Sequence, residues 1–340
     1  MIFFLKKGRI NRYSAASGLA AFLVFFLSLL LAPYYNEGDQ ITYTMVYELV
    51  SDLSLIDGFI AYSGTLGGTT EFIHYLVISI ASGWGVEKNT VMACANTILA
   101  FILMRLFREW KVYLWIAVAI VLTNYYLVGM YFAAERLKFG FIFLSMSMLF
   151  VNRKIPFYAS ALLAVGSHVQ TLIMYGSLLF AEKSKALILQ LKTFKTNYKS
   201  IGFGLLGAIL LLIGSAIVGG YVFGKVASYY ALNINQTALQ FVRTALFLIL
   251  SLSYSKTKLI TTLQFVPLFL AVFIVGAERV NMLSYILFLY YGLKFNGGVN
   301  FGVITTSMYF ALKSVSFVVE FINTGQGFGE FTTFPGNVLF

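Results

Sequence analysis

The chain has few charged residues, few prolines and a single cysteine, and this scarcity defines its class. Only 11% of its 340 residues are charged, 59% are hydrophobic, and the mean hydropathy is +0.84. A soluble domain of this length does not have such a composition, so the sequence predicts an all-α polytopic membrane protein. Because Cys94 is the sole cysteine, no intrachain disulfide can form.

The sequence also lacks the motifs of several chemistries. It has no His/Cys cluster with zinc spacing, no P-loop or dinucleotide-binding fingerprint, and no G-x-S-x-G elbow. We therefore expect neither a metal nor a cofactor. The net charge of +11 could suggest nucleic acid, but the basic residues lie in short loops between apolar runs, where they orient a membrane protein. Membrane lipids, and not nucleic acid, are the expected partners.

Apolar runs of roughly membrane-spanning length are the candidate crossings. They occupy residues 15–33, 90–107, 113–132, 136–151, 155–180, 201–223, 237–253, 259–276, 280–293 and 299–319. Basic residues precede the first run and no small-residue cleavage site follows it. We therefore expect an uncleaved first helix and a cytoplasmic N-terminus.

The distribution of Lys and Arg orients the first half of the chain. Residues 34–70 contain neither, so they are expected as an external loop. The weaker apolar run 72–83 is short for a full crossing, and we expect it to dip into the membrane and return. The cluster of Arg105, Arg108 and Lys111 then falls on the inside, as the positive-inside rule favours.

A second bend is expected in 155–180. A small and polar stretch around His168 interrupts this run, and two half-helices meeting there return the chain to the inside. The lysines of 182–200 then lie inside, in a basic amphipathic segment on the inner leaflet. The outcome is a single transmembrane domain, 1–340, with about ten to twelve membrane segments.

In this topology, ionisable residues that interrupt the apolar pattern fall on the external side, opposite the lysine-rich loops. They are Asp39, Glu71, Arg136, His168, Glu278 and Arg279. An ionisable group at the end of a membrane helix is costly to keep there, which makes it a functional candidate. We infer one external site for a charged, membrane-anchored substrate.

Each candidate also has a structural interpretation. Asp39 fits either a general base at the mouth of an apolar groove or an ordinary solvated loop. Glu71 either starts a helix at 72–83 and complements its dipole, or joins the site with His74, which follows on the same face. His168 is either a hydrogen-bonded member of the bundle or a catalyst.

The basic candidates leave similar alternatives. Arg136 and Lys138 place two cations at the start of one helix, which opposes the helix dipole. Either Glu135 neutralises one of them or an anion such as pyrophosphate binds there, since the planar guanidinium suits phosphate oxygens. Glu278 and Arg279 either bridge each other or leave Arg279 facing substrate.

The order of these residues resembles the bacterial exopolysaccharide polymerases, the EpsG-like branch of the Wzy-type family that makes O-antigen, capsule or exopolysaccharide. The matching elements are Gly38-Asp39 with Tyr43, Glu71-Phe72, Arg136-Leu137-Lys138-Phe139, Ser167-His168-Val169-Gln170, and Glu278-Arg279 with Tyr285. The match departs where the family often has an arginine before the Gly-Asp element and Arg-Gln at the helix start.

The resemblance implies a membrane-embedded, metal-independent glycosyltransferase of the bacterial inner membrane. Such a polymerase transfers the growing glycan from undecaprenyl pyrophosphate to a new undecaprenyl-pyrophosphate-linked oligosaccharide on the periplasmic or external face. A membrane protein that regulates chain length is a further implied partner.

The resemblance also implies roles for the candidate residues. The catalytic group is Asp39, His168 and Glu71, in which Asp39 or His168 is the base and Glu71 orients the acceptor. The pyrophosphate-binding group is Arg136, Lys138, Arg279 and Glu278.

Two other functions share this composition. A lipid-linked oligosaccharide flippase or transporter would have a similar number of helices, but it would carry charged groups at mid-depth in several of them. This chain keeps its charges mostly at helix ends. A ligase-type transferase, which joins finished glycans to a lipid core, would use a similar site with a different acceptor.

Overall fold

The computed structural model describes residues 12–193, 234–272 and 277–326, and the secondary structure in these ranges is helical without a strand. The predicted all-α class is confirmed for this part of the chain. The predicted span at 201–223 lies outside the described residues.

The chain divides into two compact units. The helices of the first unit are α1 (Arg12–Leu31), η1 (Ala32–Tyr34), α2 (Asp39–Leu49), α3 (Leu55–Thr65), α4 (Phe72–Gly83), α5 (Lys88–Glu109), α6 (Leu114–Thr123), α7 (Tyr125–Phe132), α8 (Glu135–Leu149), α9 (Lys154–Ser167), η2 (Asn296–Gly298) and α15 (Phe301–Thr324). The helices of the second are α10 (Thr171–Thr193), whose first residue belongs to the first unit, α12 (Ile234–Tyr254), α13 (Lys258–Val272) and α14 (Ala277–Lys294). The single domain expected over 1–340 stays a prediction.

Three helical segments of the described chain are long and apolar enough to cross a membrane, and all belong to the first unit: Arg12–Tyr34, Lys88–Glu109 and Asn296–Thr324. The pair α6 and α7 forms a fourth crossing if it counts as one span, although it bends by 47°. Asn124 causes this bend locally, since its Oδ1 caps α7 by accepting from the Tyr126 amide at 3.1 Å. These apolar helices support a membrane protein.

The core of the first unit lies where α5 packs against α1 and α8, and where α8 packs against α9. Large apolar side chains fill it, such as Leu99 and Met104 of α5 and Leu144 of α8. One buried amide links α5 with α1 and α7, because Asn96 Nδ2 donates to Ser28 Oγ and to the Tyr131 carbonyl, both at 2.9 Å. Such a shared amide holds neighbouring helices in register.

The spanning helices of the first unit place their basic residues and their buried ion pairs at opposite ends. Arg108 at the end of α5 donates to Ser14 near the start of α1 at 3.3 Å, so these helices are antiparallel. The Tyr113 amide donates to the Gly297 carbonyl at 2.9 Å, which places the start of α6 beside the start of α15. Lys88 lies at the other end of α5, about 30 Å from Arg108 at the usual rise of 1.5 Å per residue.

Both ends of helix α4 lie close to the first turn of α8, where the buried ion pairs are. Glu71, just before α4, contacts Arg136, and Lys88, just after it, contacts Glu135. Arg136 and Glu135 are neighbours in the first turn of α8. Both ends of α4 therefore lie near the first turn of α8, and the expected dip of 72–83 into the membrane stays a prediction.

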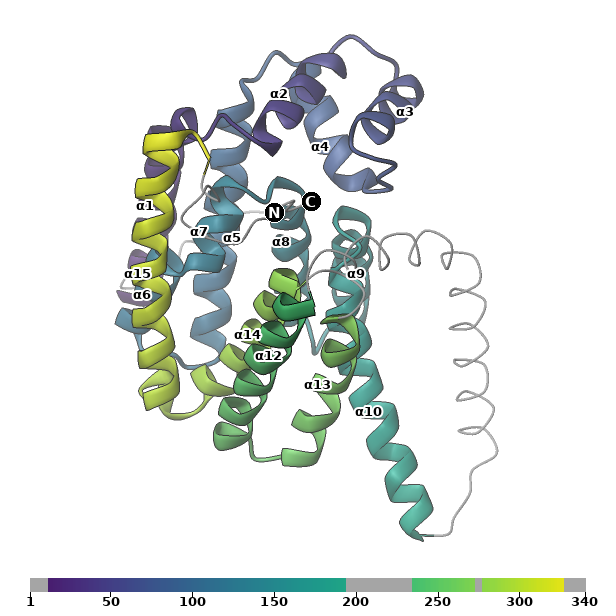
Figure 1. Cartoon of the computed structure of the whole chain (residues 1–340), viewed down its shortest axis with the longest axis vertical. Coiled ribbons are helices and arrows are strands. Elements are labelled where there is room, and N and C mark those ends of the chain that lie inside the picture. The colour runs from purple at the N-terminus through teal and green to yellow at the C-terminus, as the bar shows by residue number, and fades with distance from the viewer. Residues whose placement is uncertain (1–11, 194–233, 273–276, 327–340) are drawn as a thin grey trace, which may run out of the picture. The chain divides into compact units, whose positions relative to one another are not determined.

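The segment 34–70, expected as an external loop, is largely helical. It contains α2 and α3, and the latter begins where Ser54 Oγ accepts from the Asp57 amide. Figure 1 shows α2, α3 and α4 together at one end of the first unit. We call these three helices, residues 39–83, the cap. The sequence missed them because short amphipathic helices resemble solvated loops when no long apolar run marks them.

The predicted break in 155–180 is confirmed. Helix α9 ends at Ser167, His168 has an extended backbone, and the next helix begins at Thr171. The basic segment expected at 182–200 continues α10 as far as Thr193, and its remainder lies outside the described residues.

The second unit contains a packed group of α12, α13 and α14, matching the runs predicted at 237–253, 259–276 and 280–293. Its centre is aromatic, since Phe247 of α12 packs against Tyr285 of α14 with ring centroids 5.4 Å apart.

Candidate functional site

Glu71 joins two distant parts of the first unit. Its Oε2 accepts from Arg136 Nη1 at 2.8 Å, and its Oε1 contacts Nδ1 of His168. The Glu71 side chain is only 6% exposed and makes no capping hydrogen bond to α4. Of the two interpretations of Glu71, the structure therefore shows a side chain turned into the predicted cluster.

Arg136 lies in the first turn of α8 and faces the cap. Its Nε donates to Tyr43 Oη at 3.1 Å, and its guanidinium lies 5.9 Å from the centre of the Tyr43 ring. The side chain is 18% exposed. Because a guanidinium has more N–H groups than these contacts use, Arg136 keeps donors for an anion.

His168 is positioned by the break between α9 and α10. Its amide donates to the Ala164 carbonyl at 3.0 Å, and its carbonyl accepts from Thr171 Oγ1 at 2.8 Å. Gly140 of α8 permits this approach, because a Cβ on Gly140 would lie 3.1 Å from the His168 Cβ and 2.9 Å from Thr171 Cγ2. Among the described residues, His168 Nδ1 has Glu71 as its partner and Nε2 has none.

The environment of Glu71 keeps its carboxylate ionised. Burial alone would raise its pKa, but the hydrogen bond and charge of His168 and the charge of Arg136 lower the pKa to about 2. Burial raises the pKa of Tyr43 to about 12, against the smaller opposing effect of Arg136. Near neutral pH, Glu71 is therefore an acceptor that fixes its partners, and Tyr43 is a neutral hydroxyl.

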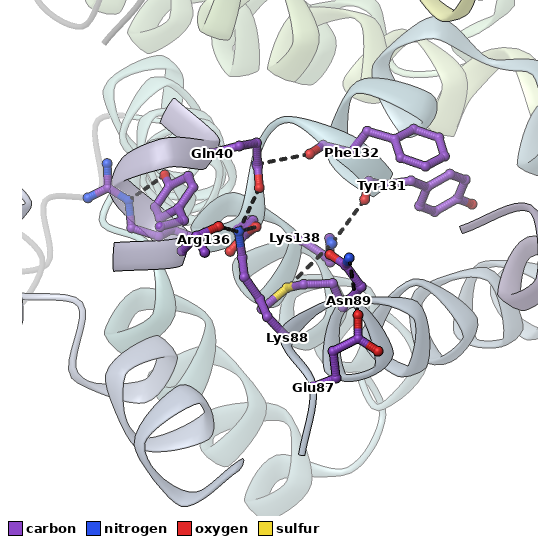
Figure 2. A network of polar contacts seen from close by, with 12 residues as sticks. Gln40, Glu87, Lys88, Asn89, Tyr131, Phe132, Arg136 and Lys138 are labelled. Carbon is purple, nitrogen blue, oxygen red and sulfur yellow. Dashed lines mark hydrogen bonds and ion pairs between the residues drawn. The ribbon is translucent and has the colours of Figure 1, made fainter. Parts of the chain in front are cut away.

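A second network holds the cap on the bundle (Figure 2). Lys88 Nζ lies 3.0 Å from Glu135 Oε1 and donates to Gln40 Oε1 at 2.8 Å and to Thr44 Oγ1 at 3.1 Å. Gln40 Nε2 donates in turn to the Phe132 carbonyl at 3.1 Å. The buried Lys88 ammonium thus joins α5, α2 and α8, and Gln40 extends the network to the end of α7.

This network identifies the ion-pair partner of Glu135. Its ion pair is with Lys88, at the start of α5, and not with Arg136 of its own helix. The sequence missed Lys88 because that residue reads as an ordinary basic residue before a membrane helix. Its only signal is that it is the first Lys or Arg after Arg12.

Lys138 is placed differently from the expected pyrophosphate ligand. It is fully buried, and its Nζ donates to the Tyr131 carbonyl at 3.1 Å and contacts Met92 Sδ at 3.8 Å. Figure 2 shows it directed at the carbonyl of Tyr131. In this arrangement Lys138 connects α8 with the end of α7 and offers no exposed donor.

The remaining predicted residues belong to other helices. Asp39 is the half-buried first residue of α2, one turn before Tyr43, whose electrostatic environment it affects. Arg279 belongs to α14 of the second unit. The side chain of Glu278 lies outside the described residues. A shared site for Arg279 and Glu278 with Glu71 therefore stays a prediction.

A second histidine lies beside the cluster. Tyr62 Oη and His74 Nδ1 are 2.9 Å apart and both side chains are buried. The His74 ring packs edge-on against Phe139 of α8, with centroids 5.4 Å apart. His74 was visible from its spacing after Glu71. Tyr62 was not, because nothing in the sequence distinguishes it from the other tyrosines.

The described residues contain no group of three His, Cys, Asp or Glu side chains that could hold a metal ion. Compared with known proteins, the chain matches no family model, no curated protein and no solved structure. What the geometry offers is a histidine oriented by a carboxylate, with an arginine on the other oxygen of that carboxylate. This arrangement can remove a proton from a hydroxyl and stabilise an anion a short distance away.

Proposed function

We propose that the protein is a membrane-embedded glycosyltransferase that polymerises lipid-linked oligosaccharide repeat units. The supporting observation is the contact of one Glu71 carboxylate with both His168 and Arg136. Three residues far apart in the sequence, two of them the expected base and anion ligand, thereby meet at one end of the first unit.

The reaction proposed is a displacement at the anomeric carbon of the growing glycan. The acceptor hydroxyl of a new repeat unit forms a bond to this carbon, and the bond from the carbon to undecaprenyl pyrophosphate breaks. The hydroxyl proton passes to Nε2 of His168, and the electron pair of the broken bond leaves with the pyrophosphate. The step is balanced without a metal or cofactor.

Glu71 supports His168 as the base. An ionised carboxylate on Nδ1 fixes the tautomer in which Nε2 is free to accept a proton, and it stabilises the imidazolium that forms. This contact with an ionised carboxylate is what favours His168 between the two expected bases.

Arg136 is the group proposed to hold the leaving pyrophosphate. Its Nε and one Nη1 hydrogen are directed at Tyr43 and Glu71, which fixes the guanidinium plane. The other N–H groups suit paired phosphate oxygens. A preoriented cation of this kind stabilises negative charge as it develops.

The membrane arrangement is part of the same proposal. We place the protein in the bacterial cytoplasmic membrane, with the N-terminus inside, ten to twelve membrane segments in all and the site on the external face. Arg105, Arg108 and Lys111 lie at the opposite end of α5 from Lys88 and the ion pairs, which supports this orientation through the positive-inside rule.

The test is surface-polysaccharide length in the source strain with this gene deleted, complemented with variants whose membrane abundance is measured in parallel. Wild type restores a ladder of long chains. Well-expressed His168→Ala and Arg136→Ala leave single repeat units, whereas Arg105→Ala, a matched control at the opposite end, restores the ladder.

Two outcomes would contradict the proposal. If single repeat units never reach the outside of the deletion strain, export is the missing step and a flippase is the better assignment. If long chains form but stay on the lipid carrier, the protein is a ligase-type transferase.

A further inference from the structure

We propose that the cap lies in the membrane interface, with outward apolar side chains of α2 and α3 inserted among lipid acyl chains of the leaflet on the side of the site. This placement rests on the membrane-spanning character of α1, α5 and α15. It does not depend on the transfer reaction.

The helix α2 has apolar residues on two faces. Its inner face, with Tyr43 and Val46, is buried against the rest of the first unit. Its outer face exposes Ile41, Met45 and Leu49, which recur every four residues and so form one stripe. Exposure of this apolar stripe to water would be unfavourable in free energy, so we expect an apolar partner to cover it.

The helix α3 continues this exposed apolar surface. Ile56 is 74% exposed and Ile60 is 65% exposed, and they lie four residues apart on one side of the helix. On the opposite side of the helix, Tyr62 is completely buried. Isolated exposed apolar residues are ordinary on protein surfaces. Exposed isoleucine and methionine residues on two neighbouring helices instead indicate a surface that contacts another apolar partner.

The short connections of the cap identify lipid as the cover. Tyr35–Gly38 link η1 to α2, and Trp84–Glu87 link α4 to α5. Four residues span at most about 14 Å, so the cap cannot move away from the ends of two membrane helices. Asn36 and Glu37 also bond to the Gly325 carbonyl at the end of α15, at 3.1 and 3.0 Å. All three long apolar segments thus end at the cap.

Aromatic and charged residues of the cap and of the adjoining helix ends also indicate that the cap lies at the membrane surface. Trp84, at the end of α4, is 80% exposed, and Tyr34, at the end of η1, is also exposed. Exposed Trp and Tyr at helix ends are typical of the lipid headgroup region. Glu48 and Asp57 interrupt the apolar stripes of the cap, which fits helices lying in the interface better than helices within the hydrocarbon.

An interfacial cap gives the candidate site a defined depth. Tyr43 and Glu71, on the inner side of the cap, contact Arg136. They would lie at the level of phosphate headgroups, where the pyrophosphate of a lipid-linked substrate also lies. This depth would suit the lipid-linked substrate of the proposed function, which stays in its leaflet.

The experiment measures the depth of two matched pairs of cap residues. The full chain carrying Cys94→Ala receives one new cysteine at a time, Ile60→Cys or Asp57→Cys. Each is labelled with bimane and reconstituted into phosphatidylcholine vesicles. Quenching is compared between a nitroxide on the lipid acyl chains and aqueous iodide. Met45→Cys and Glu48→Cys repeat the comparison on α2, so that one poorly folded variant does not decide the result.

The proposal requires that lipid nitroxide quenches the labels at Ile60 and Met45 several-fold more than those at Asp57 and Glu48, with the reverse order for iodide. Two outcomes would overturn it. Strong iodide quenching at all four sites would place the cap in water. Protection of Ile60 and Met45 from both quenchers would show that protein, such as a second copy of the chain, covers the surface.

Discussion

The substitution Glu71→Gln distinguishes two roles of Glu71, the orientation of His168 as a base and a structural ion pair with Arg136. It keeps the size of the side chain and an oxygen that can accept from Arg136, so the contact between α4 and α8 is largely retained. On the other side, it replaces an acceptor by an amide NH2 that faces His168 Nδ1. The imidazole must then accept at Nδ1 and carry its proton on Nε2, where it cannot act as a base.

The size of the effect follows from this change of tautomer. In enzymes whose catalytic histidine is oriented by a carboxylate, the same carboxylate-to-amide exchange lowers kcat by about four orders of magnitude. Because Glu71 also shares its charge with Arg136, we expect a loss of about three orders of magnitude, equivalent to about 4 kcal/mol in the activation free energy. The loss should appear in kcat with little change in KM if Glu71 acts through His168, because both of its oxygens are engaged by His168 and Arg136. A rise in KM would instead support the expected role of Glu71 in orienting the acceptor.

The assay is the initial rate of chain extension by purified protein with a lipid-linked repeat unit, at substrate concentrations on both sides of KM. Glu71→Asp keeps the charge and should retain more activity than Glu71→Gln. Asp57→Asn is the control for a carboxylate-to-amide change elsewhere in the cap and should leave the rate unchanged. A folded Glu71→Gln variant with nearly wild-type kcat would refute the assignment of His168 as a base oriented by Glu71.

Three further predictions concern stability and packing. Lys88→Met leaves Glu135 buried without its ion-pair partner and should lower the free energy of unfolding by about 3 to 5 kcal/mol; adding Glu135→Leu should recover much of the loss in Tm, and a failure to recover would contradict a buried pair. Gly140→Ala places a methyl group within 3.1 Å of the helix break and should reduce activity with a minor change in Tm, whereas Gly129→Ala, with open space around it, should do neither. Because the folded-state pKa of Glu71 is lowered, its contribution to stability is complete above the ordinary pKa of 4.5 and is lost as pH falls toward 2. The Tm difference between wild type and Glu71→Gln should therefore hold down to about pH 5 and shrink below it, and a difference that grows with acid would contradict the sign.

The long apolar helices could be predicted from the sequence because each has a strong local signal. The runs 15–33, 90–107 and 299–319 lie within helices of the structure that are long enough to span a membrane. The break at His168 was also predictable, since the small and polar residues around it cannot sustain an apolar helix. In both cases the signal lies within about 20 neighbouring residues.

The cap and the partners within the cluster could not be predicted in the same way. Helices α2 and α3 are short and carry mixed side chains, so their pattern resembles that of a solvated loop. The ion pair of Lys88 with Glu135 joins residues 47 positions apart. Only the tertiary arrangement brings such residues together, and many other pairs of opposite charge would fit the sequence equally well.

Lys138 shows a limit of motif-based assignment. Its spacing from Arg136 suggested that both would face one anion, but residues two apart on a helix point in different directions. The structure accordingly directs Arg136 to the cap and Lys138 into the core. The sequence pattern therefore located the start of the helix, but it could not tell which of the two cations is accessible.

We propose that this chain by itself joins lipid-linked repeat units with His168 as the base. The most direct measurement reconstitutes the purified protein in vesicles with undecaprenyl-pyrophosphate-linked oligosaccharide as the sole substrate, and follows glycan length and released undecaprenyl pyrophosphate together. The account predicts that wild type produces longer glycans and releases one lipid pyrophosphate for each new linkage, while His168→Ala at equal abundance does neither. An absence of extension by well-folded wild type, or equal extension by His168→Ala, would contradict it.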